Sequence, residues 1–352
     1  MHLKNKKILI TGLFVSTRNK DIIYRTAADQ LAEVLIENKF SLIKTSYQVN
    51  KFLRAIDIML TILFKSFFYK IAIVPFYGSA NAFIIENWST KLLRLLNKKI
   101  ILIVHGGGLP SRLQNNPKKY LSVLKRATQI VCPSPFLQHE IKKYGIDSLV
   151  IENVLKLSDY QCVNKESFTP KILWMRAFSD IYNPLMAVRV LARLMKIMPT
   201  TTLIMAGKDL GNLADVKQLA KQLNVENNIS YPGYVHTETK NELAKQIDIY
   251  ICTNKVDNAP VTFIEMMALG IPIVSVNVGG IPYLVKDNIN GLLVNLDDDE
   301  AMVSAILRIV NNSKLGKQIA KNGLNTSQQY GSEIVVAKWQ SLFNKLLTKK
   351  YN

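Results

Sequence analysis

Two acidic residues stand eight positions apart in DNAPVTFIEMMALG, residues 257–270. Asp257 lies in a polar stretch, and Glu265 lies inside an apolar run of Phe, Ile and Met side chains. An ionised carboxylate in such surroundings is costly unless a partner compensates its charge. The partner could be another side chain, or it could be a ligand such as the hydroxyls of a ribose.

A helix start is predicted between the two acids. Proline is accommodated at the first helical position, so Pro260 marks the predicted start of a helix. The amides of Val261 and Thr262 would then be unpaired donors at the positive end of a helix, which favours phosphate. The turn NVGG, residues 277–280, follows the next apolar run and would bring backbone close to the same place.

Two more polar residues close apolar runs that read as strands. Arg176 ends KILWMRA, and a guanidinium at the carboxyl end of a strand suits bidentate phosphate contact. The alternative role of Arg176 is an ion pair with a residue such as Asp180. His105 opens HGGGLP after KIILIV, where glycines let the backbone approach a ligand or simply form a turn.

Two enzyme classes lose support from the same turns. HGGG supplies oxyanion-hole amides in lipases, but the G-x-S-x-G elbow that this chemistry needs is missing from the sequence. TGLFVS, residues 11–16, contains only Gly12 and lacks the G-x-G-x-x-G of dinucleotide-binding folds. A serine hydrolase and a nicotinamide enzyme are therefore disfavoured.

Predicted strands and helices alternate along the chain, and this alternation indicates two doubly wound parallel sheets that would position these residues. The predicted strands are 7–15, 40–46, 70–78, 99–106, 129–134 and 148–153, then 171–177, 201–207, 228–235, 247–253, 271–276 and 291–296. The predicted helices of the first half are 22–38, 51–68, 81–96, 118–127 and 135–144. The polar segment 156–170 reads as a linker. We expect an α/β protein with two Rossmann-like domains facing a central cleft, with ligands at the carboxyl ends of the strands.

Three segments divide the chain in this prediction. Residues 1–165 form a first domain, and residues 166–330 form a second domain. Residues 331–352 form a C-terminal helix that packs back on the first. The net charge of +19 is uneven, since residues 1–165 hold 25 basic and 10 acidic side chains. A basic first half predicts an anionic partner, either nucleic acid or acidic lipid.

The anionic partner favoured here is a membrane surface, because no nucleic-acid-reading motif or basic-aromatic run occurs. The segment 52–69 carries its polar residues on one narrow stripe and is otherwise apolar. It is either a helix buried on most sides or one that inserts partly into a bilayer surface. The first residues read as a strand rather than a signal peptide. The three cysteines are far apart, which disfavours a zinc site or disulfides and fits a reducing cytosol.

Residues 171–295 resemble the donor domain of the retaining nucleotide-sugar glycosyltransferases of family 4, which have the GT-B fold. The resemblance rests on WMRAFSD…NP, LIMAGKD, YPGYVH, the two acids with seven residues between them, and EMMALGIPIVSVNVGGIPYLV…NGLLV. The first half matches more loosely, through HGGGLP and VIENV.

The resemblance implies an enzyme that takes a sugar from a nucleotide-diphosphate donor, UDP-type favoured, with retention and with no obligatory metal or other cofactor. The acceptor would be a saccharide or a lipid-linked saccharide in cell-envelope polysaccharide or glycolipid synthesis. The protein would act in the cytoplasm or peripherally on the inner face of the cell membrane. The alternative is a catalytically silent relative that binds sugar nucleotides or acts as a scaffold.

Carried over by position, the resemblance assigns Glu265 to the ribose and Asp257 to the donor sugar. Arg176 and the amides of Val261 and Thr262 would stabilise the diphosphate leaving group. His105 would lie near the donor sugar and Gly12 near the phosphates. The base would contact the stretch from Tyr234 to His236.

Two positions depart from the family pattern. Asp257 stands where the family usually has glutamate, and Asn183-Pro184 stands where it usually has Lys-Gly. Losing a cation at the diphosphate would weaken stabilisation of the transition state. We expect Lys208, in AGKD after the next strand, to compensate.

Overall fold

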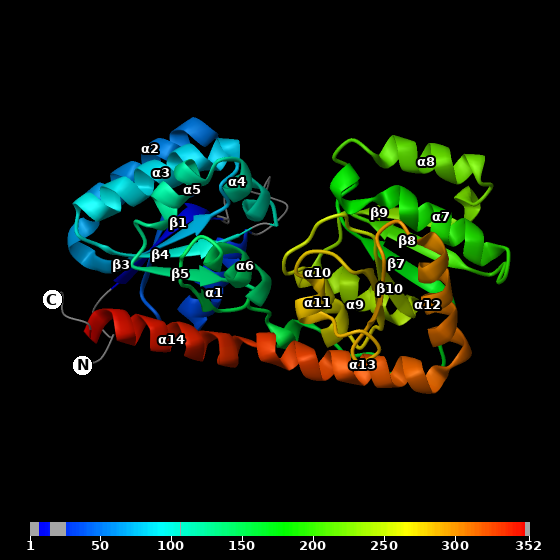
Figure 1. Cartoon of the computed structure of the whole chain (residues 1–352). Coiled ribbons are helices and arrows are strands. Elements are labelled where there is room, and N and C mark those ends of the chain that lie inside the picture. Colours follow the sequence, from blue (N-terminus) through cyan, green and yellow to red (C-terminus); the bar gives the residue numbers. More distant parts are fainter. Residues whose placement is uncertain (1–6, 15–25, 106, 349–352) are drawn as a thin grey trace. The chain divides into compact units, whose positions relative to one another are not determined.

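The computed structural model describes residues 7–14, 26–105 and 107–348. The chain divides into two compact units, residues 1–154 with 332–352 (unit 1) and residues 155–331 (unit 2). Each unit contains a six-stranded sheet, and all the strand pairs between named strands are parallel. Helices flank both sheets (Figure 1). The prediction of two doubly wound α/β units is therefore confirmed.

The sheet of unit 1 has the order β2-β1-β3-β4-β5-β6. Its strands are β1 (Lys7–Leu13), β2 (Leu42–Ser46), β3 (Tyr69–Phe76), β4 (Lys99–Val104), β5 (Gln129–Cys132) and β6 (Leu149–Val150). Its helices are α1 (Ala27–Glu37), α2 (Lys51–Phe64), η2 (Ser66–Phe68), α3 (Ala80–Leu95), α4 (Leu109–Asn115), α5 (Pro117–Leu124), α6 (Pro135–Lys142) and α14 (Ser332–Thr348). The chain winds outward in opposite directions from β1 and from β3, so the topological switch point of unit 1 lies between these two strands.

Helix α14 belongs to the core of unit 1 although it lies at the end of the described chain. Val335, Trp339 and Phe343 recur at every fourth position and are almost fully buried, in one cluster with residues of β1 and α1. Trp339 also packs against Phe343, with ring centroids 5.6 Å apart. This spacing places one apolar face of the helix against the sheet layer.

The sheet of unit 2 has the order β12-β11-β10-β7-β8-β9. Its strands are β7 (Lys171–Met175), β8 (Thr202–Ala206), β9 (Ile229–Gly233), β10 (Ile249–Cys252), β11 (Ile273–Val276) and β12 (Leu292–Val294). Its helices are η3 (Leu157–Asp159), η4 (Asp180–Tyr182), α7 (Pro184–Met195), α8 (Leu213–Gln222), η5 (Glu226–Asn228), α9 (Thr237–Gln246), α10 (Val261–Ala268), α11 (Ile281–Leu284), α12 (Asp299–Asn311), α13 (Ser313–Ser327) and η6 (Gln328–Tyr330). The switch point of this sheet lies between β7 and β10.

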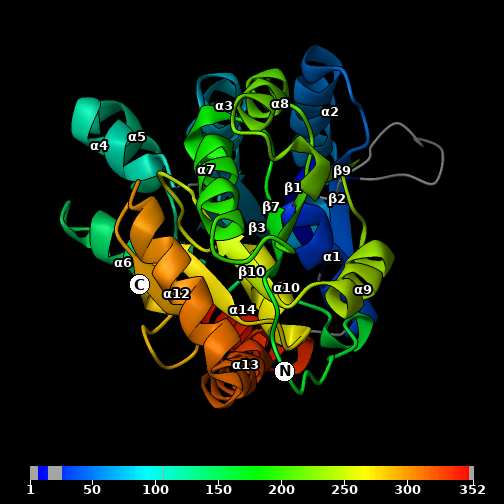
Figure 2. The same cartoon turned by 90° about the vertical axis from the view of Figure 1, so that its right-hand side faces the viewer.

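Helices α7 and α12 lie side by side on unit 2 (Figure 2). Arg189 of α7 donates through Nε and Nη2 to the two carboxylate oxygens of Asp299, at 2.7 and 3.0 Å. This bidentate pair fixes the start of α12 against α7.

The polar segment that reads as a linker packs on unit 2 instead. Phe168 is buried, the amide of Val163 donates to the carbonyl of Leu269 at 2.9 Å, and Thr169 Oγ1 donates to Asp248 Oδ2 at 2.5 Å. The sequence predicted a linker because this segment is polar. Its polar groups instead make hydrogen bonds to parts of unit 2 that lie far away in the sequence.

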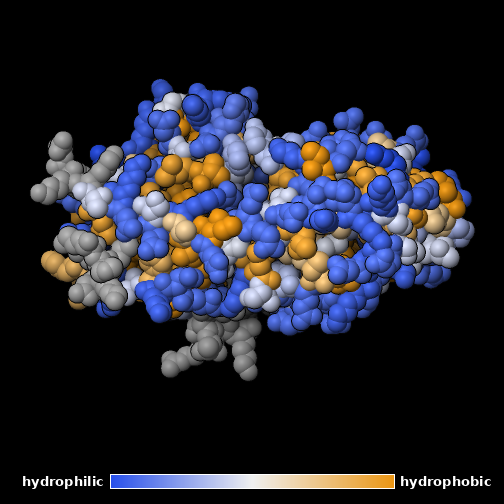
Figure 3. All heavy atoms as spheres, turned by 90° about the horizontal axis from the view of Figure 1, so that it is seen from below, coloured by the Kyte–Doolittle hydropathy of each residue, from blue (hydrophilic) through white to orange (hydrophobic). Residues whose placement is uncertain are grey.

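Some predicted features fall outside the described residues. They are residue 15 of the first strand, the helix start at residues 22–25, and Gly106 of the glycine turn. Among the described residues, no helix combines the length and the apolarity needed to cross a membrane. Figure 3 shows one face of the molecule, on which hydrophilic residues predominate and hydrophobic residues form separate patches.

Replacing the buried indole of α14 tests its place in the core. Trp339→Ala should destabilise unit 1 by about 3–5 kcal/mol, because it removes a side chain that is 2% exposed. For a unit of this size the melting temperature should fall by about 6–20 °C. The control is Ile334→Ala on the same helix, where the side chain is 45% exposed. Equal melting temperatures for the two variants would contradict the packing.

Candidate active site

Arg176 and Asp257 meet at the switch point of unit 2. Arg176 follows β7, Asp257 lies in the loop after β10, and the two strands are neighbours in the sheet. Arg176 Nη2 donates to Asp257 Oδ2 at 2.9 Å. Ligands of open α/β sheets bind outside the carboxyl ends of the strands at such a point.

The Arg176 guanidinium is largely buried, with 12% of its side chain exposed. Burial lowers its pKa, but Tyr250, Asp257 and the other acidic groups around it raise the pKa above its ordinary value, so the group stays charged. Its Nε is buried without a hydrogen-bond partner, and the guanidinium lies 5.7 Å from the ring centroid of Tyr182. The alternative partner considered from the sequence, Asp180, accepts from Lys255 at 2.6 Å instead.

Asp257 is held from several sides. Its Oδ2 also accepts from Asn254 Nδ2 at 2.6 Å, and its Oδ1 accepts from the amide of Asn258 at 2.7 Å. The amide of Gly280 donates to the Asp257 carbonyl at 2.9 Å. A Cβ on Gly280 would stand 1.8 Å from the Asn258 carbonyl oxygen. The two glycines of NVGG are thus explained by close backbone packing that fixes the Asp257 loop.

Helix α10 begins one residue later than predicted. Pro260 is its N-cap residue, and the first helical residues are Val261 and Thr262, both half-buried. The Tyr250 hydroxyl donates to Thr262 Oγ1 at 3.4 Å. The amides at this end have no intrahelical acceptor, and the helix dipole makes the end positive.

Glu265 has two protein partners. Its Oε1 accepts from Lys240 Nζ at 2.8 Å and from the Tyr160 hydroxyl at 2.9 Å. The Glu265 side chain is 9% exposed and that of Lys240 is 13% exposed, so a buried charge is compensated within the protein. Burial, and secondly the charge of Glu265, raises the pKa of Tyr160.

The sequence did not single out Lys240 or Tyr160. They lie 25 and 105 positions from Glu265, and no local spacing marks either of them as its partner. Tyr234, after β9, lies close enough for Glu265 to add to the effect of burial in raising its pKa. Its ring packs edge-on against His236, the N-cap residue of α9, with centroids 5.1 Å apart.

Lys208 lies in an exposed loop after β8, beside the backbone of Arg176. The amide of Phe178 donates to the Lys208 carbonyl at 2.8 Å. Gly207 has a φ of +157°, and a Cβ there would stand 1.8 Å from the Arg176 carbonyl oxygen. Glycine therefore allows the loop with Lys208 to pass next to Arg176.

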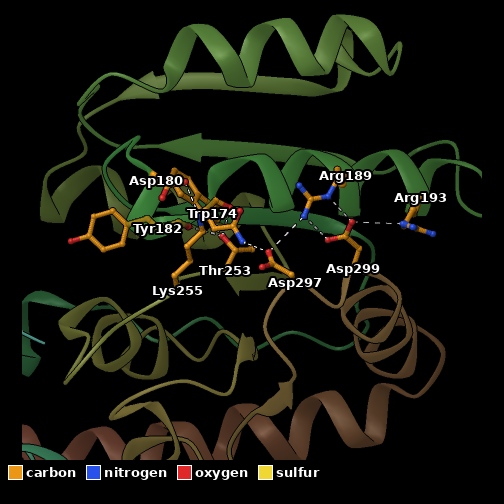
Figure 4. A network of polar contacts seen from close by, with 10 residues as sticks. Trp174, Asp180, Tyr182, Arg189, Arg193, Thr253, Lys255, Asp297 and Asp299 are labelled. Atoms are coloured by element: carbon orange, nitrogen blue, oxygen red, sulfur yellow. Dashed lines mark hydrogen bonds and ion pairs between the residues drawn. The ribbon is translucent and has the colours of Figure 1, made fainter. Parts of the chain in front are cut away.

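Asn183, which stands where the family resemblance predicts lysine, takes part in a structural network with Thr253 and Asp297. Figure 4 shows Thr253 and Asp297 in this network. Asn183 adopts the left-handed conformation with φ of 48°, which asparagine tolerates better than most residues. Its Nδ2 donates to Asp297 Oδ1 at 2.7 Å, and its carbonyl accepts from Thr253 Oγ1 at 2.9 Å. Trp174 Nε1 donates to the same hydroxyl at 2.9 Å. The network fixes the loop between Arg176 and α7.

The remaining predicted residues lie in unit 1. His105 follows β4 and stacks on Tyr77 with ring centroids 5.3 Å apart. Burial lowers the pKa of His105 from 6.5 to about 4, so the ring is neutral at neutral pH. Gly12, in β1, has a φ of +156°, and its amide donates to Thr45 Oγ1 at 3.2 Å.

A cavity of about 360 Å³ lies at the switch point of unit 1. Residues at the ends of β1 and β3 and along α2 and α3 line it, with Lys51 and Arg54 among them. Glu86 accepts from the amides of Tyr77 and Gly78 at 2.8 and 3.1 Å, and burial raises its pKa to about 7. Ser89 Oγ, also in the lining, is buried without a partner. The cavity thus combines apolar walls with a few polar groups, as ligand pockets do.

Several known proteins show sequence similarity to the chain, including the following three. An uncharacterized glycosyltransferase of Haemophilus influenzae is 29% identical over 129 residues, which covers 36% of each chain. The lipopolysaccharide core biosynthesis glycosyltransferase LpsE of Rhizobium meliloti is 25% identical over 223 residues, 61% of this chain and 63% of the relative. The UDP-Gal:alpha-D-GlcNAc-diphosphoundecaprenol alpha-1,3-galactosyltransferase of Escherichia coli is 23% identical over 243 residues, 61% of each. The matched segments thus span less than two thirds of these relatives.

Solved structures extend the similarity in fold to nearly the whole chain. HepE of Anabaena, in complex with UDP and glucose, superposes with a TM-score of 0.75 at 16% identity, over 97% of this chain and 100% of that one. Residues 163–326 match the family model of glycosyl transferases group 1. Most of unit 2 therefore matches a glycosyl transferases group 1 domain, and the chain has the fold of the GT-B glycosyltransferases.

Proposed function

We propose that this protein transfers a sugar, with retention of configuration, from a nucleotide-diphosphate sugar of the UDP type to a saccharide or lipid-linked saccharide of the cell envelope. The family match supports the transfer. The UDP bound to HepE and the UDP-Gal donor of the Escherichia coli relative support the donor class. The diphosphoundecaprenol acceptor of that relative supports a lipid-linked acceptor.

The buried Arg176 at the switch point of unit 2 is the observation that carries the proposal. Charge develops on the diphosphate as the glycosidic bond breaks, and preorganised donors that face this charge lower the barrier. Arg176 would meet the diphosphate together with the amides of Val261 and Thr262 at the start of α10. Lys208, whose loop passes beside Arg176, would add a second cation. These groups would supply positive charge without a metal.

Around the diphosphate, the other residues would hold the rest of the donor. Glu265 would accept from the ribose hydroxyls, with Lys240 and Tyr160 orienting its carboxylate. Tyr234 and His236 would contact the base. Asp257, held by Arg176 and by the glycine turn, would contact the donor sugar.

Unit 1 would supply the acceptor side. Its cavity between α2 and α3 has polar groups, Glu86 and Ser89, set into apolar walls, which suits a sugar hydroxyl next to an apolar carrier. The neutral His105 would donate or accept a hydrogen bond with the donor sugar, and Gly12 would lie near the phosphates. The enzyme would work in the cytoplasm, on the inner face of the membrane where a lipid carrier lies.

UDP binding tests the donor site directly. UDP at 100 times its dissociation constant should stabilise the protein by about 2.7 kcal/mol. That corresponds to about 5–11 °C in melting temperature for a unit of this size. Glu265→Gln should reduce the shift, since a neutral amide accepts less strongly from the ribose. The control is Glu242→Gln on α9, where the carboxylate is 63% exposed. A UDP shift without turnover of any UDP-sugar would instead indicate a catalytically silent relative.

Removing the switch-point cation tests the chemistry. Arg176→Ala should lower kcat by about 10²–10³-fold, the effect of losing one preorganised donor to developing charge. Arg193→Ala, on the exposed face of α7, should leave kcat unchanged. Because Asp257 loses its partner in Arg176→Ala, thermal unfolding should be measured beside the kinetics. A folded Arg176→Ala protein with wild-type turnover of UDP-sugar would disprove the role.

The neutral state of His105 makes a prediction about pH. The unfolded chain binds a proton at His105 near pH 6.5, whereas the folded protein does so only near the lowered pKa of about 4. This stabilisation is therefore fully present above pH 6.5 and is lost as the pH falls toward 4. Chemical denaturation of wild type and His105→Gln should show wild type losing about 2–3 kcal/mol more between neutral pH and about pH 4.5. Parallel losses in the two proteins would show that His105 titrates normally.

A further inference from the structure

Helix α2 exposes apolar side chains in addition to Ile58 and Ile62, which it buries in the core of unit 1. Its polar residues Arg54, Asp57 and Thr61 are half-buried, and Thr61 Oγ1 donates to the carbonyl of Thr45 at 3.3 Å. Its outward face is apolar, and the exposed residues there are Phe52, Leu53, Ile56, Leu60, Leu63 and Phe64. A surface helix of a globular protein normally shows the opposite pattern.

The apolar surface continues beyond α2. Phe67 and Phe68 of η2 are 96% and 58% exposed. Helix α3, which packs beside α2 (Figure 1), exposes Ile84, Trp88 and Leu95 along one face. We call these exposed residues of α2, η2 and α3 the apolar face of unit 1. Exposed apolar side chains gathered on neighbouring elements in this way mark an interaction site rather than ordinary exposure.

Basic residues surround the apolar face. Residues 51–99 contain eight lysines and arginines but only two acids, and one of these, Glu86, is buried. Lys65 is exposed between Phe64 and Phe67, and Lys91 Nζ lies 5.0 Å from the ring centroid of Trp88. Unit 1 as a whole holds 27 basic and 10 acidic residues, which is +17 of the net +19.

The positive charge around this face distinguishes between two binding partners, a second copy of the protein and an anionic bilayer. In a symmetric dimer the same patch meets itself, so lysines from one copy would face lysines from the other. Like charges brought together in this way oppose association. An anionic bilayer, in contrast, offers an apolar interior to Phe and Trp side chains and negative head groups to the lysines around them.

We propose that the apolar face of unit 1 docks on an anionic lipid surface, with α2 and η2 lying in the plane of the interface. The aromatic side chains would enter the head-group region, while Lys65 and Lys91 remain at the level of the lipid phosphates. The cavity between α2 and α3 would then open close to the membrane that carries a lipid-linked acceptor. Docking itself needs neither donor nor acceptor, so it is tested independently of the proposed transfer.

Vesicle sedimentation of the full chain tests the proposal. Wild type should bind vesicles of phosphatidylcholine mixed with phosphatidylglycerol, and bind pure phosphatidylcholine more weakly. The double variant Phe64→Glu/Phe67→Glu should bind the anionic vesicles at least about tenfold more weakly, because two apolar side chains no longer enter the interface. The control is Ile36→Glu/Ile197→Glu, which makes the same charge change at side chains that are 48% and 59% exposed elsewhere.

Lysine variants separate electrostatic attraction from apolar insertion. Lys65→Gln/Lys91→Gln should bind anionic vesicles about tenfold or more weakly than Lys196→Gln/Lys221→Gln on unit 2. The melting temperature and the circular dichroism spectrum should match those of wild type in all these variants, which shows that each is folded. Equal vesicle binding by Phe64→Glu/Phe67→Glu and its control would overturn the proposal. So would a wild-type dimer in sedimentation velocity that Phe64→Glu/Phe67→Glu converts to monomer while vesicle binding persists.

Discussion

A buried guanidinium needs a compensating charge, and the switch point of unit 2 is arranged around this requirement at Arg176. Asp257 provides the opposite charge at 2.9 Å and is itself held by Asn254, by the amide of Asn258 and by the turn at Gly280. The glycines on either side follow from the same constraint, since side chains at Gly207 or Gly280 would collide with backbone next to Arg176 and Asp257. The ion pair therefore explains the positions of glycines that look like generic turn residues in the sequence.

The same logic accounts for Glu265. A carboxylate within an apolar helix is stable here because Lys240 and Tyr160 reach it from α9 and from the segment before β7. These partners hold the carboxylate in one orientation, and a carboxylate accepts strongly from hydroxyl groups. The ion pair with Lys240 and the proposed hydrogen bonds to ribose both use the Glu265 carboxylate, so the two explanations of this residue are compatible.

The two units repeat one architecture with different chemistry. Each parallel sheet has a switch point, between β1 and β3 in unit 1 and between β7 and β10 in unit 2. In unit 2 this point carries a charged Arg176, whereas in unit 1 it carries a cavity with Glu86, whose pKa is raised to about 7. These differences fit the proposed function, in which unit 2 binds the diphosphate of a donor and unit 1 binds the hydroxyl groups of an acceptor.

The sequence by itself determined the alternation of strands and helices, and with it the two parallel sheets, because buried strands and amphipathic helices have distinct local periodicities. It also singled out Arg176, Asp257 and Glu265 as residues that need partners. Only the tertiary structure determined which residues those partners are, since Lys240 and Tyr160 lie far from Glu265 along the chain. It decided too that Asn183 fixes a loop and that an apolar face of α2 is left exposed. Periodicity shows that a helix has two faces, but only the packing of the whole unit determines which face meets the core.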